Sequence, residues 1–190
     1  MQLENIPVVI LAGGFGTRLS EQTEFIPKPM VPIGGNPILW HIMKIYSHYG
    51  LRRFIVCLGY KGELIKEYFL NYRIRNSDFT INISDENSIR LHNSHANDNW
   101  EVTLAETGSR ALTGARIKKI EKYINSEHFL LTYGDGVSNV RIDKTIDFHL
   151  SHKKVATVTG VKPPSRFGEL IVSGSKVIEF GEKPQVGSGM

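Results

Sequence analysis

The fold is decided by Leu11-Ala12-Gly13-Gly14-Phe15-Gly16-Thr17-Arg18-Leu19, with Pro27-Lys28-Pro29 close behind. The stretch follows an apolar run, residues 7–11, that is typical of a buried strand. Glycines at a strand's end let the backbone turn tightly and leave amide N–H groups free to bind phosphate oxygens. The Thr17 hydroxyl can donate a further hydrogen bond, and Arg18 and Lys28 add positive charge. The sequence therefore predicts a polyphosphate site at the end of the first strand.

The stretch differs from the common phosphate-binding motifs. It lacks Gly-Lys-Ser/Thr, which excludes a Walker A loop, and its glycine spacing is not Gly-x-Gly-x-x-Gly. Gly13-Gly14 alone would favour an ordinary strand-to-loop turn. The whole string together with Pro-Lys-Pro favours a phosphate site instead.

These residues resemble the signature of the sugar-1-phosphate nucleotidyltransferases, in which this loop and a Pro-Lys pair bind the nucleoside triphosphate. Further matches along almost the whole chain resemble the glucose-1-phosphate cytidylyltransferases, at residues 28–31, 34–41, 59–62, 132–136 and 166–168. The resemblance implies transfer of a cytidylyl group from CTP to α-D-glucose 1-phosphate, giving CDP-glucose and pyrophosphate. Such a product would feed deoxysugar synthesis for surface polysaccharide, such as lipopolysaccharide O-antigen. Another nucleotide (dTTP, UTP or GTP), another sugar phosphate, or a non-catalytic nucleotide-binding subunit stays open.

Composition is that of a globular enzyme. The chain has 190 residues, 41% hydrophobic and 22% charged, and its apolar runs are too short to span a membrane. Its net charge is +4, but lysines and arginines are scattered among acids, so neither nucleic acid nor membrane is an expected partner. The single cysteine, Cys57, lies in an apolar run and suits a buried thiol in a cytoplasmic protein.

Strand and helix patterns alternate along the chain. Strands are predicted at 7–11, 54–58, 79–83, 102–105, 129–133, 155–161, 170–172 and 177–180, and helices at 37–49, 62–71, 113–123 and 142–152. This alternation predicts an α/β, Rossmann-like three-layer sandwich with a mostly parallel central sheet, and ligands bind such sheets beyond the carboxyl ends of the strands. The resemblance implies a GT-A-like nucleotidyltransferase domain over residues 1–190. The polar stretch 85–99 is expected to be an exposed excursion and a subunit contact.

Asp135 is the predicted metal ligand. It follows the apolar strand 129–133, where a carboxylate at the sheet edge can hold Mg²⁺, although aspartate before glycine also commonly caps a turn. The resemblance favours the metal, because the matching aspartate of the family binds magnesium. A second metal hypothesis, at His92 and His95, is weaker because suitably spaced carboxylates or thiolates are missing from the sequence around them.

The substrate-binding residues come mainly from the resemblance. Glu182 is expected to contact sugar hydroxyls and Lys183 the sugar phosphate. For the base, Arg116 is expected to donate to cytosine O2 or to the triphosphate; alternatively, Thr113 caps a helix and Arg116 is solvated. A serine is usual in the family where Ala111 stands, so one base contact would come from the backbone or be lost. The residues predicted to bind the nucleotide are Leu11, Ala12, Gly13, Gly14, Phe15, Gly16, Thr17, Arg18, Lys28, Thr107, Gly108, Ala111, Arg116 and Gly134.

The predicted chemistry is in-line attack by the sugar phosphate on the α-phosphorus of CTP. The nucleophile is already an anion, so positioning and charge stabilisation suffice, with Arg18, Lys28 and Asp135 as the catalytic residues. Members of the family usually form homo-oligomers, trimers or hexamers. They also continue with further strands and a second magnesium aspartate, so the resemblance predicts the N-terminal part of a longer protein or a shortened relative.

Overall fold

The computed structural model describes residues 3–15, 25–85, 88–94, 98–161 and 169–181. The chain forms two compact units, divided after Ile142. Among the described residues, no helix is both long and apolar enough to cross a membrane.

The first unit is built on a four-stranded parallel sheet in the order β7-β4-β1-β8. Its strands are β1 (Val8–Leu11), β4 (Arg53–Leu58), β7 (Glu101–Glu106) and β8 (Leu130–Tyr133). Leu11 at the end of β1 stands opposite Cys57 of β4 and Tyr133 of β8. Because all pairs are parallel, the carboxyl ends of the strands meet at one edge, as the sequence predicts.

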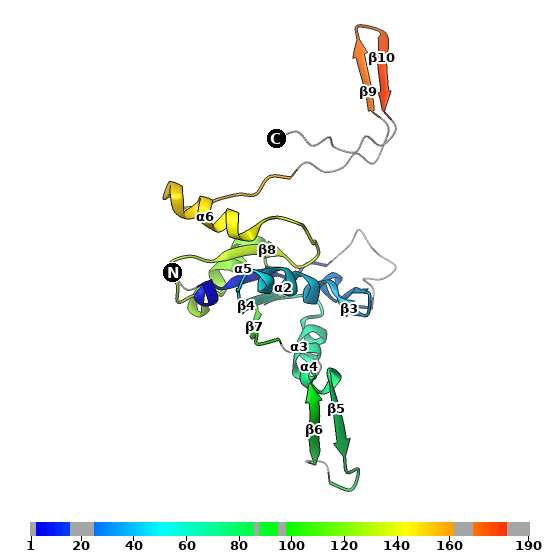
Figure 1. The fold of residues 1–190 in the computed structure, drawn as a ribbon, viewed down its shortest axis with the longest axis vertical. Helices are drawn as coiled ribbons and strands as arrows, with labels where there is room; N and C mark the ends of the chain where they lie inside the picture. The colour runs from blue at the N-terminus through cyan, green and yellow to red at the C-terminus, as the bar shows by residue number, and fades with distance from the viewer. Residues whose placement is uncertain (1–2, 16–24, 86–87, 95–97, 162–168, 182–190) are drawn as a thin grey trace. The chain divides into compact units, whose positions relative to one another are not determined.

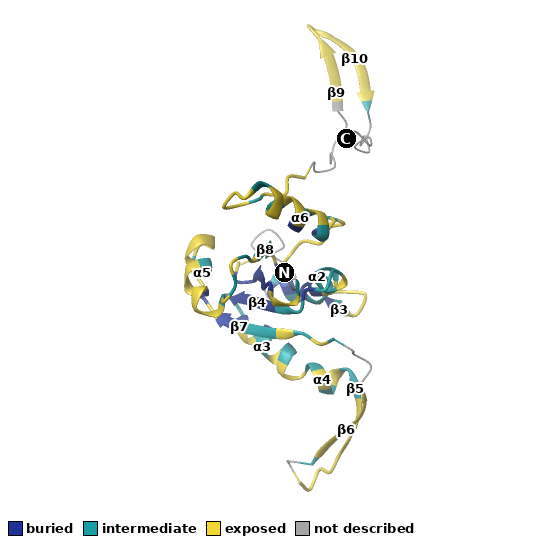
Figure 2. Cartoon of the chain, turned by 60° about the vertical axis from the view of Figure 1, so that its left-hand side comes forward, coloured by how far each residue is buried: buried dark blue, intermediate teal, exposed yellow. Residues whose placement is uncertain are grey.

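Helices cover both faces of this sheet: α2 (Ile38–His48), α3 (Gly62–Leu70) and α5 (Thr113–Lys119) gather around it in Figure 1. One face buries Val9, Leu11, Ile55, Cys57 and Ala105 against Ile120, the residue that ends α5. On the other face Phe54 contacts the Trp100 ring, whose indole N–H donates to Ser47 of α2. Buried residues accordingly concentrate on the central strands (Figure 2). The predicted three-layer α/β architecture is confirmed.

Beyond α4 (Tyr72–Arg75), a hairpin of β5 (Ser77–Ile81) and β6 (Ile89–Ser94) projects from the first unit (Figure 1). Strand β6 was not predicted; its short alternation of apolar and polar residues lies inside the polar stretch 85–99. The register places Phe79 opposite Leu91 and Ile81 opposite Ile89. A smaller hairpin pairs β2 (Pro32–Ile33) with β3 (Asn36–Pro37).

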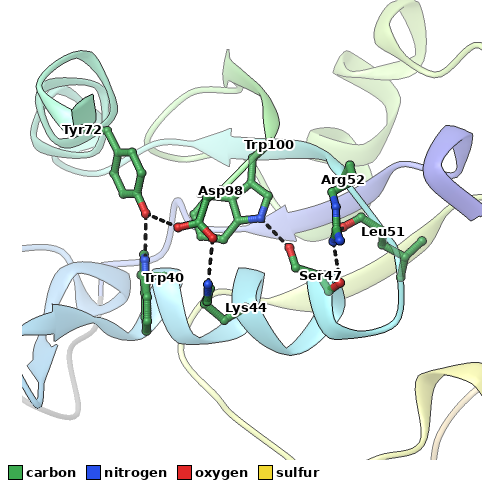
Figure 3. Close-up of polar contacts among 8 residues, drawn as sticks. All are labelled: Trp40, Lys44, Ser47, Leu51, Arg52, Tyr72, Asp98 and Trp100. Atoms are coloured by element: carbon green, nitrogen blue, oxygen red, sulfur yellow. Dashed lines mark hydrogen bonds and ion pairs between the residues drawn. The ribbon is translucent and has the colours of Figure 1, made fainter. Parts of the chain in front are cut away.

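Asp98, which follows the β5–β6 hairpin in the chain, is hydrogen-bonded to residues of α2 and α4 (Figure 3). Its carboxylate accepts hydrogen bonds from Lys44 Nζ at 2.8 Å and from the Tyr72 hydroxyl at 2.6 Å. The Tyr72 oxygen in turn accepts from Trp40 Nε1 at 2.9 Å. We call these four residues, with Trp100 and Ser47, the Asp98 network.

The second unit contains most of α6 (Ile142–His152) and an antiparallel hairpin of β9 (Glu169–Ser173) and β10 (Lys176–Gly181). The prediction of a strand at 155–161 is wrong: the described residues there form no ladder, and Val155 and Val158 are exposed. Thr157 instead lies 2.8 Å from ring nitrogens of both His149 and His152 of α6.

In the first unit, the helix predicted at 113–123 is shorter than expected, because α5 ends at Lys119 and a separate 3-10 turn, η4 (Glu121–Tyr123), follows.

Candidate functional site

A cavity of about 580 Å³ opens at the carboxyl edge of the sheet in the first unit. Its walls come from the ends of β1 and β8, from the 3-10 helix η3 (Lys28–Met30) and from the start of α5. The lining residues are Leu11, Ala12, Gly13, Gly14, Lys28, Pro29, Ala111, Leu112, Thr113, Arg116, Tyr133 and Asp135. The structure thus brings the described part of the glycine loop together with Lys28, Arg116 and Asp135.

Gly134 sets how closely β8 approaches β1 at the cavity. Its N–H donates to Leu11 O at 3.0 Å, and a Cβ at this position would lie 3.1 Å from that oxygen and 3.1 Å from Pro29 Cγ. A larger residue would push these three segments apart. Glycine here therefore fixes where the next residue, Asp135, enters the cavity wall.

Lys28 and Asp135 form an ion pair, with Lys28 Nζ 2.6 Å from Asp135 Oδ2. Their side chains are 29% and 38% exposed, so the pair adds at most about 1 kcal/mol to stability. The sequence analysis placed both residues in the site without predicting this contact. The ion pair therefore places a cation and a carboxylate side by side on one wall of the cavity.

Asp135 suits a magnesium ion only if other ligands come with the substrate. Among the described residues, no group of three or more histidines, cysteines or carboxylates could hold a metal. Mg²⁺ is commonly held by one or two carboxylates, with phosphate oxygens and water completing its shell. The carboxylate present therefore fits a magnesium ion bound jointly with a triphosphate. His92, the described member of the alternative histidine pair, contacts Thr80 Oγ1 at 2.8 Å.

Arg116 is buried, at 5% exposure, and so the alternative in which it is solvated is wrong. Its Nη1 donates to Leu58 O at 3.0 Å and to Thr107 Oγ1 at 2.6 Å, and its Nη2 donates to Gly13 O at 2.9 Å. The companion expectation that Thr113 caps α5 is wrong as well. Leu112 occupies the N-cap position, with no side-chain cap bond, and Thr113 is the first helical residue.

Thr107 lies at the end of β7 with its hydroxyl engaged in the protein. The hydroxyl donates to Leu58 O at 2.5 Å while accepting from Arg116, and the residue is 1% exposed. Gly108 follows with a φ of 96°, a left-handed conformation that favours glycine. The predicted contacts of Thr107 and Gly108 with the base stay predictions.

Burial sets the charge of the groups behind the cavity. It raises the pKa of the Cys57 thiol to about 11, against the opposing effect of the Arg116 charge, so the thiol is neutral at physiological pH. Burial lowers the pKa of Arg116, yet arginine stays protonated under these conditions. Arg116 and Lys28 are therefore the cations of the described cavity wall and Asp135 its carboxylate, an excess of positive charge suited to an anion.

Five predicted site residues lie outside the described residues: Gly16, Thr17, Arg18, Glu182 and Lys183. Phe15 is described, and its ring lies 5.2 Å from that of Tyr60. Four residues at the cavity were not predicted as site residues: Leu112 and Tyr133, which line it, and Gly59 and Tyr60, which contact Gly13 of its wall. Tyr133, Gly59 and Tyr60 lie in segments that carry the resemblance, at residues 132–136 and 59–62, and this signal could have pointed to them.

Residues 7–188 match the family model described as nucleotidyl transferase. This chain belongs to the nucleotidyl transferase family. It is 53% identical over 178 residues to the glucose-1-phosphate cytidylyltransferase of Salmonella typhi, covering 93% of this chain and 68% of that protein. A probable glucose-1-phosphate cytidylyltransferase of Bacillus subtilis is 47% identical, with 92% and 68% covered. The D-glycero-alpha-D-manno-heptose 1-phosphate guanylyltransferase of Aneurinibacillus thermoaerophilus is 32% identical, with 92% and 66% covered.

Solved structures of similar fold agree with this nucleotidyl transferase membership. HddC from Yersinia pseudotuberculosis, complexed with GMP-PN, superposes with a TM-score of 0.61 at 28% identity, covering 95% of this chain and 70% of that one. UTP-bound UGPase from Acinetobacter baumannii gives a TM-score of 0.58 at 14% identity, with 97% and 70% covered. The second likeness concerns the fold alone.

Proposed function

We propose that this nucleotidyl transferase moves the cytidylyl group of CTP to α-D-glucose 1-phosphate, giving CDP-glucose and pyrophosphate. The observation that carries the proposal is the cavity, where the glycine loop, Lys28 and Asp135 meet at one end of the sheet. The choice of base and sugar rests on identity. The chain is 53% identical to a relative named for this reaction and 32% identical to a guanylyltransferase.

The proposed reaction needs positioning and charge rather than a protein nucleophile. A phosphate oxygen of the sugar phosphate attacks the α-phosphorus of CTP, and the bond to the leaving pyrophosphate breaks in line. Lys28 would turn from Asp135 toward the phosphates and stabilise charge near the reacting centre. Arg18 would hold the pyrophosphate and Lys183 the attacking phosphate, both as proposals for residues outside the described ranges.

Magnesium is part of this proposal. Asp135 is the described residue that would hold it, and the ion would offset the negative charge of the triphosphate when bound. Lys28, displaced from Asp135 in that state, would keep an anionic partner among the phosphate oxygens. We also propose that the protein acts in the cytoplasm as a homo-oligomer, which sedimentation analysis would test.

The deciding experiment is pyrophosphate release with glucose 1-phosphate, comparing CTP, dTTP, UTP and GTP with Mg²⁺ and with excess chelator. Release with CTP, abolished by the chelator, is the expected result. Release with another nucleotide alone would overturn the choice of base. Nucleotide binding without pyrophosphate release from any of the four would contradict the enzymatic function and favour a binding role.

A further inference from the structure

Arg116 connects the ends of three strands. From α5 it reaches Gly13 just beyond β1, Leu58 at the end of β4, and Thr107 just beyond β7. A fourth, longer contact runs from Nη2 to Ser109 O at 3.4 Å. Its hydrogen-bond partners are three carbonyl oxygens and one hydroxyl, so the planar guanidinium serves to hold backbone in place.

The bond to Gly13 fixes the direction of the next amide. The peptide between Gly13 and Gly14 is trans, so its C=O and N–H point in opposite directions. Gly13 O faces the protein, where it accepts from Arg116 Nη2 at 2.9 Å and from Tyr60 N at 3.3 Å. The N–H of Gly14, an exposed residue of the cavity wall, therefore points away from Arg116.

Two glycines make room for this guanidinium. A Cβ on Gly13 would lie 2.1 Å from Arg116 Nη1, and a Cβ on Gly59 would lie 2.7 Å from the same atom. Both distances are too short for any side chain. Gly13 and Gly59, which have no side chain, thus leave room for the Arg116 guanidinium directly beneath the loop.

We propose that Arg116 is a positioning residue, which holds the Gly13–Gly14 peptide in the orientation that binds the phosphates of the nucleotide. The proposal rests on the proposed function, because it assigns the loop a phosphate ligand. Arg116 acts through the loop carbonyl rather than as a ligand of the base. Losing it would leave the loop to be ordered by the substrate, which lowers affinity without removing a substrate contact.

Inorganic pyrophosphate with Mg²⁺ is the discriminating probe, because it has phosphates and no base. We expect Arg116→Lys to weaken both pyrophosphate and CTP by the same factor, about tenfold to a hundredfold. Loss of CTP affinity with unchanged pyrophosphate affinity would show a base ligand. Unchanged affinity for both would show that the guanidinium does not hold the loop; either result overturns the proposal.

Gly59→Ala tests the same idea with the arginine charge retained. Its added Cβ would lie 2.7 Å from both Arg116 Nη1 and Gly13 O, so the methyl group separates the guanidinium from the loop carbonyl that it holds. Pyrophosphate affinity should therefore fall as in Arg116→Lys, and unchanged affinity would contradict the proposal. Lys119→Met is the matched control: Lys119 also reaches from α5 to the end of β7, donating to Thr107 O at 2.8 Å. It should bind pyrophosphate like the wild type. An equal loss of pyrophosphate affinity in Lys119→Met would show that Arg116 only anchors α5 and has no specific effect on the loop.

Circular dichroism and thermal melting of every variant separate misfolding from loss of the site. If Arg116→Lys does not fold, the comparison of Gly59→Ala with Lys119→Met decides the matter. A wild-type protein that binds pyrophosphate but releases none from CTP would contradict the proposed function while leaving the positioning role testable by binding.

Discussion

Two polar networks hold the first unit together, one formed between side chains and the other between a side chain and the backbone. In the Asp98 network, side chains bind side chains: a carboxylate that is 8% exposed meets an ammonium and a phenol from separate helices (Figure 3). At Arg116, one side chain binds mainly backbone carbonyls at the edge of the cavity. The contrast suggests that the first network serves stability and the second serves the shape of the site.

The largest expected effect lies at the cavity wall. Lys28→Met should reduce the rate of pyrophosphate release by about a hundredfold or more, because the proposed charge stabilisation is lost. The free energy of unfolding should change by less than about 1 kcal/mol, since the pair with Asp135 is partly exposed. Steady-state kinetics and urea denaturation measure the two quantities. Near-normal release would remove Lys28 from the mechanism.

The reverse pattern is expected in the Asp98 network. Asp98→Asn should lower the free energy of unfolding by about 2–3 kcal/mol, because it removes the charge partner of Lys44 and weakens the bond from Tyr72. Folded protein should keep its kcat/KM within about twofold, because no residue of the Asp98 network lines the cavity. Urea denaturation checks the first value. A large loss of activity at unchanged stability would show that this network reaches the site.

Alkaline pH should weaken the surroundings of both networks in turn, because Cys57 feels the charge of Arg116 and the Tyr68 ring contacts that of Tyr72. Burial raises the pKa of Cys57 to about 11 and that of Tyr68 to about 12, so the folded chain keeps protons that the unfolded chain releases. This stability is complete below the unfolded pKa values and is lost as pH rises through the folded ones. For Cys57 the loss should reach about 1–2 kcal/mol at pH 10.

Cys57→Ala and Tyr68→Phe divide the alkaline loss between the two regions. In Cys57→Ala, stability measured by urea from pH 8 to 11 should fall less steeply than in the wild type. Tyr68→Phe should change the slope only at higher pH, because an unfolded tyrosine ionises near pH 10. Parallel curves for the wild type and Cys57→Ala would show that this thiol ionises alike in both states.

The smallest effect belongs to an exposed ion pair, Lys118–Glu121. Its atoms lie 2.6 Å apart, as close as the Tyr72–Asp98 and Arg116–Thr107 contacts, but the side chains are 78% and 69% exposed. Glu121→Gln should therefore cost less than about 0.5 kcal/mol in urea denaturation. A cost approaching that of Asp98→Asn would show that distance, rather than burial, sets the strength of these pairs.

Much of the sheet and cavity could be predicted because the deciding signals are local. The apolar runs ending at Leu11 and Leu58 specify strands buried on both faces, and the polar residues that follow them must lie at one edge of a parallel sheet. Asp135 was predicted on that basis, and Lys28 from the Pro-Lys-Pro motif and the resemblance. The hydrogen bonds of Arg116 could not be predicted, because they depend on the register that brings Gly13, Leu58 and Thr107 beneath one helix.

The two errors in strand prediction share a physical cause. At 155–161, β-branched residues suggested a strand, but a strand forms only where another supplies hydrogen bonds, and Thr157 contacts α6 instead. At 89–94, a partner existed in β5, and polar residues that looked irregular formed a strand. Whether a partner strand is available is not visible in the local pattern of a segment.

The strand order has a consequence for synthesis. Strand β1 is made first, but it lies between β4 and β8, and its partner Leu130–Tyr133 follows more than a hundred residues later. At roughly 5–20 residues per second, a ribosome needs about ten seconds to complete that interval. During that time one edge of an entirely apolar strand has no neighbour, which is the condition under which strands pair with other chains. If Val8–Leu11 is covered early in the nascent chain, the yield of folded protein should therefore rise.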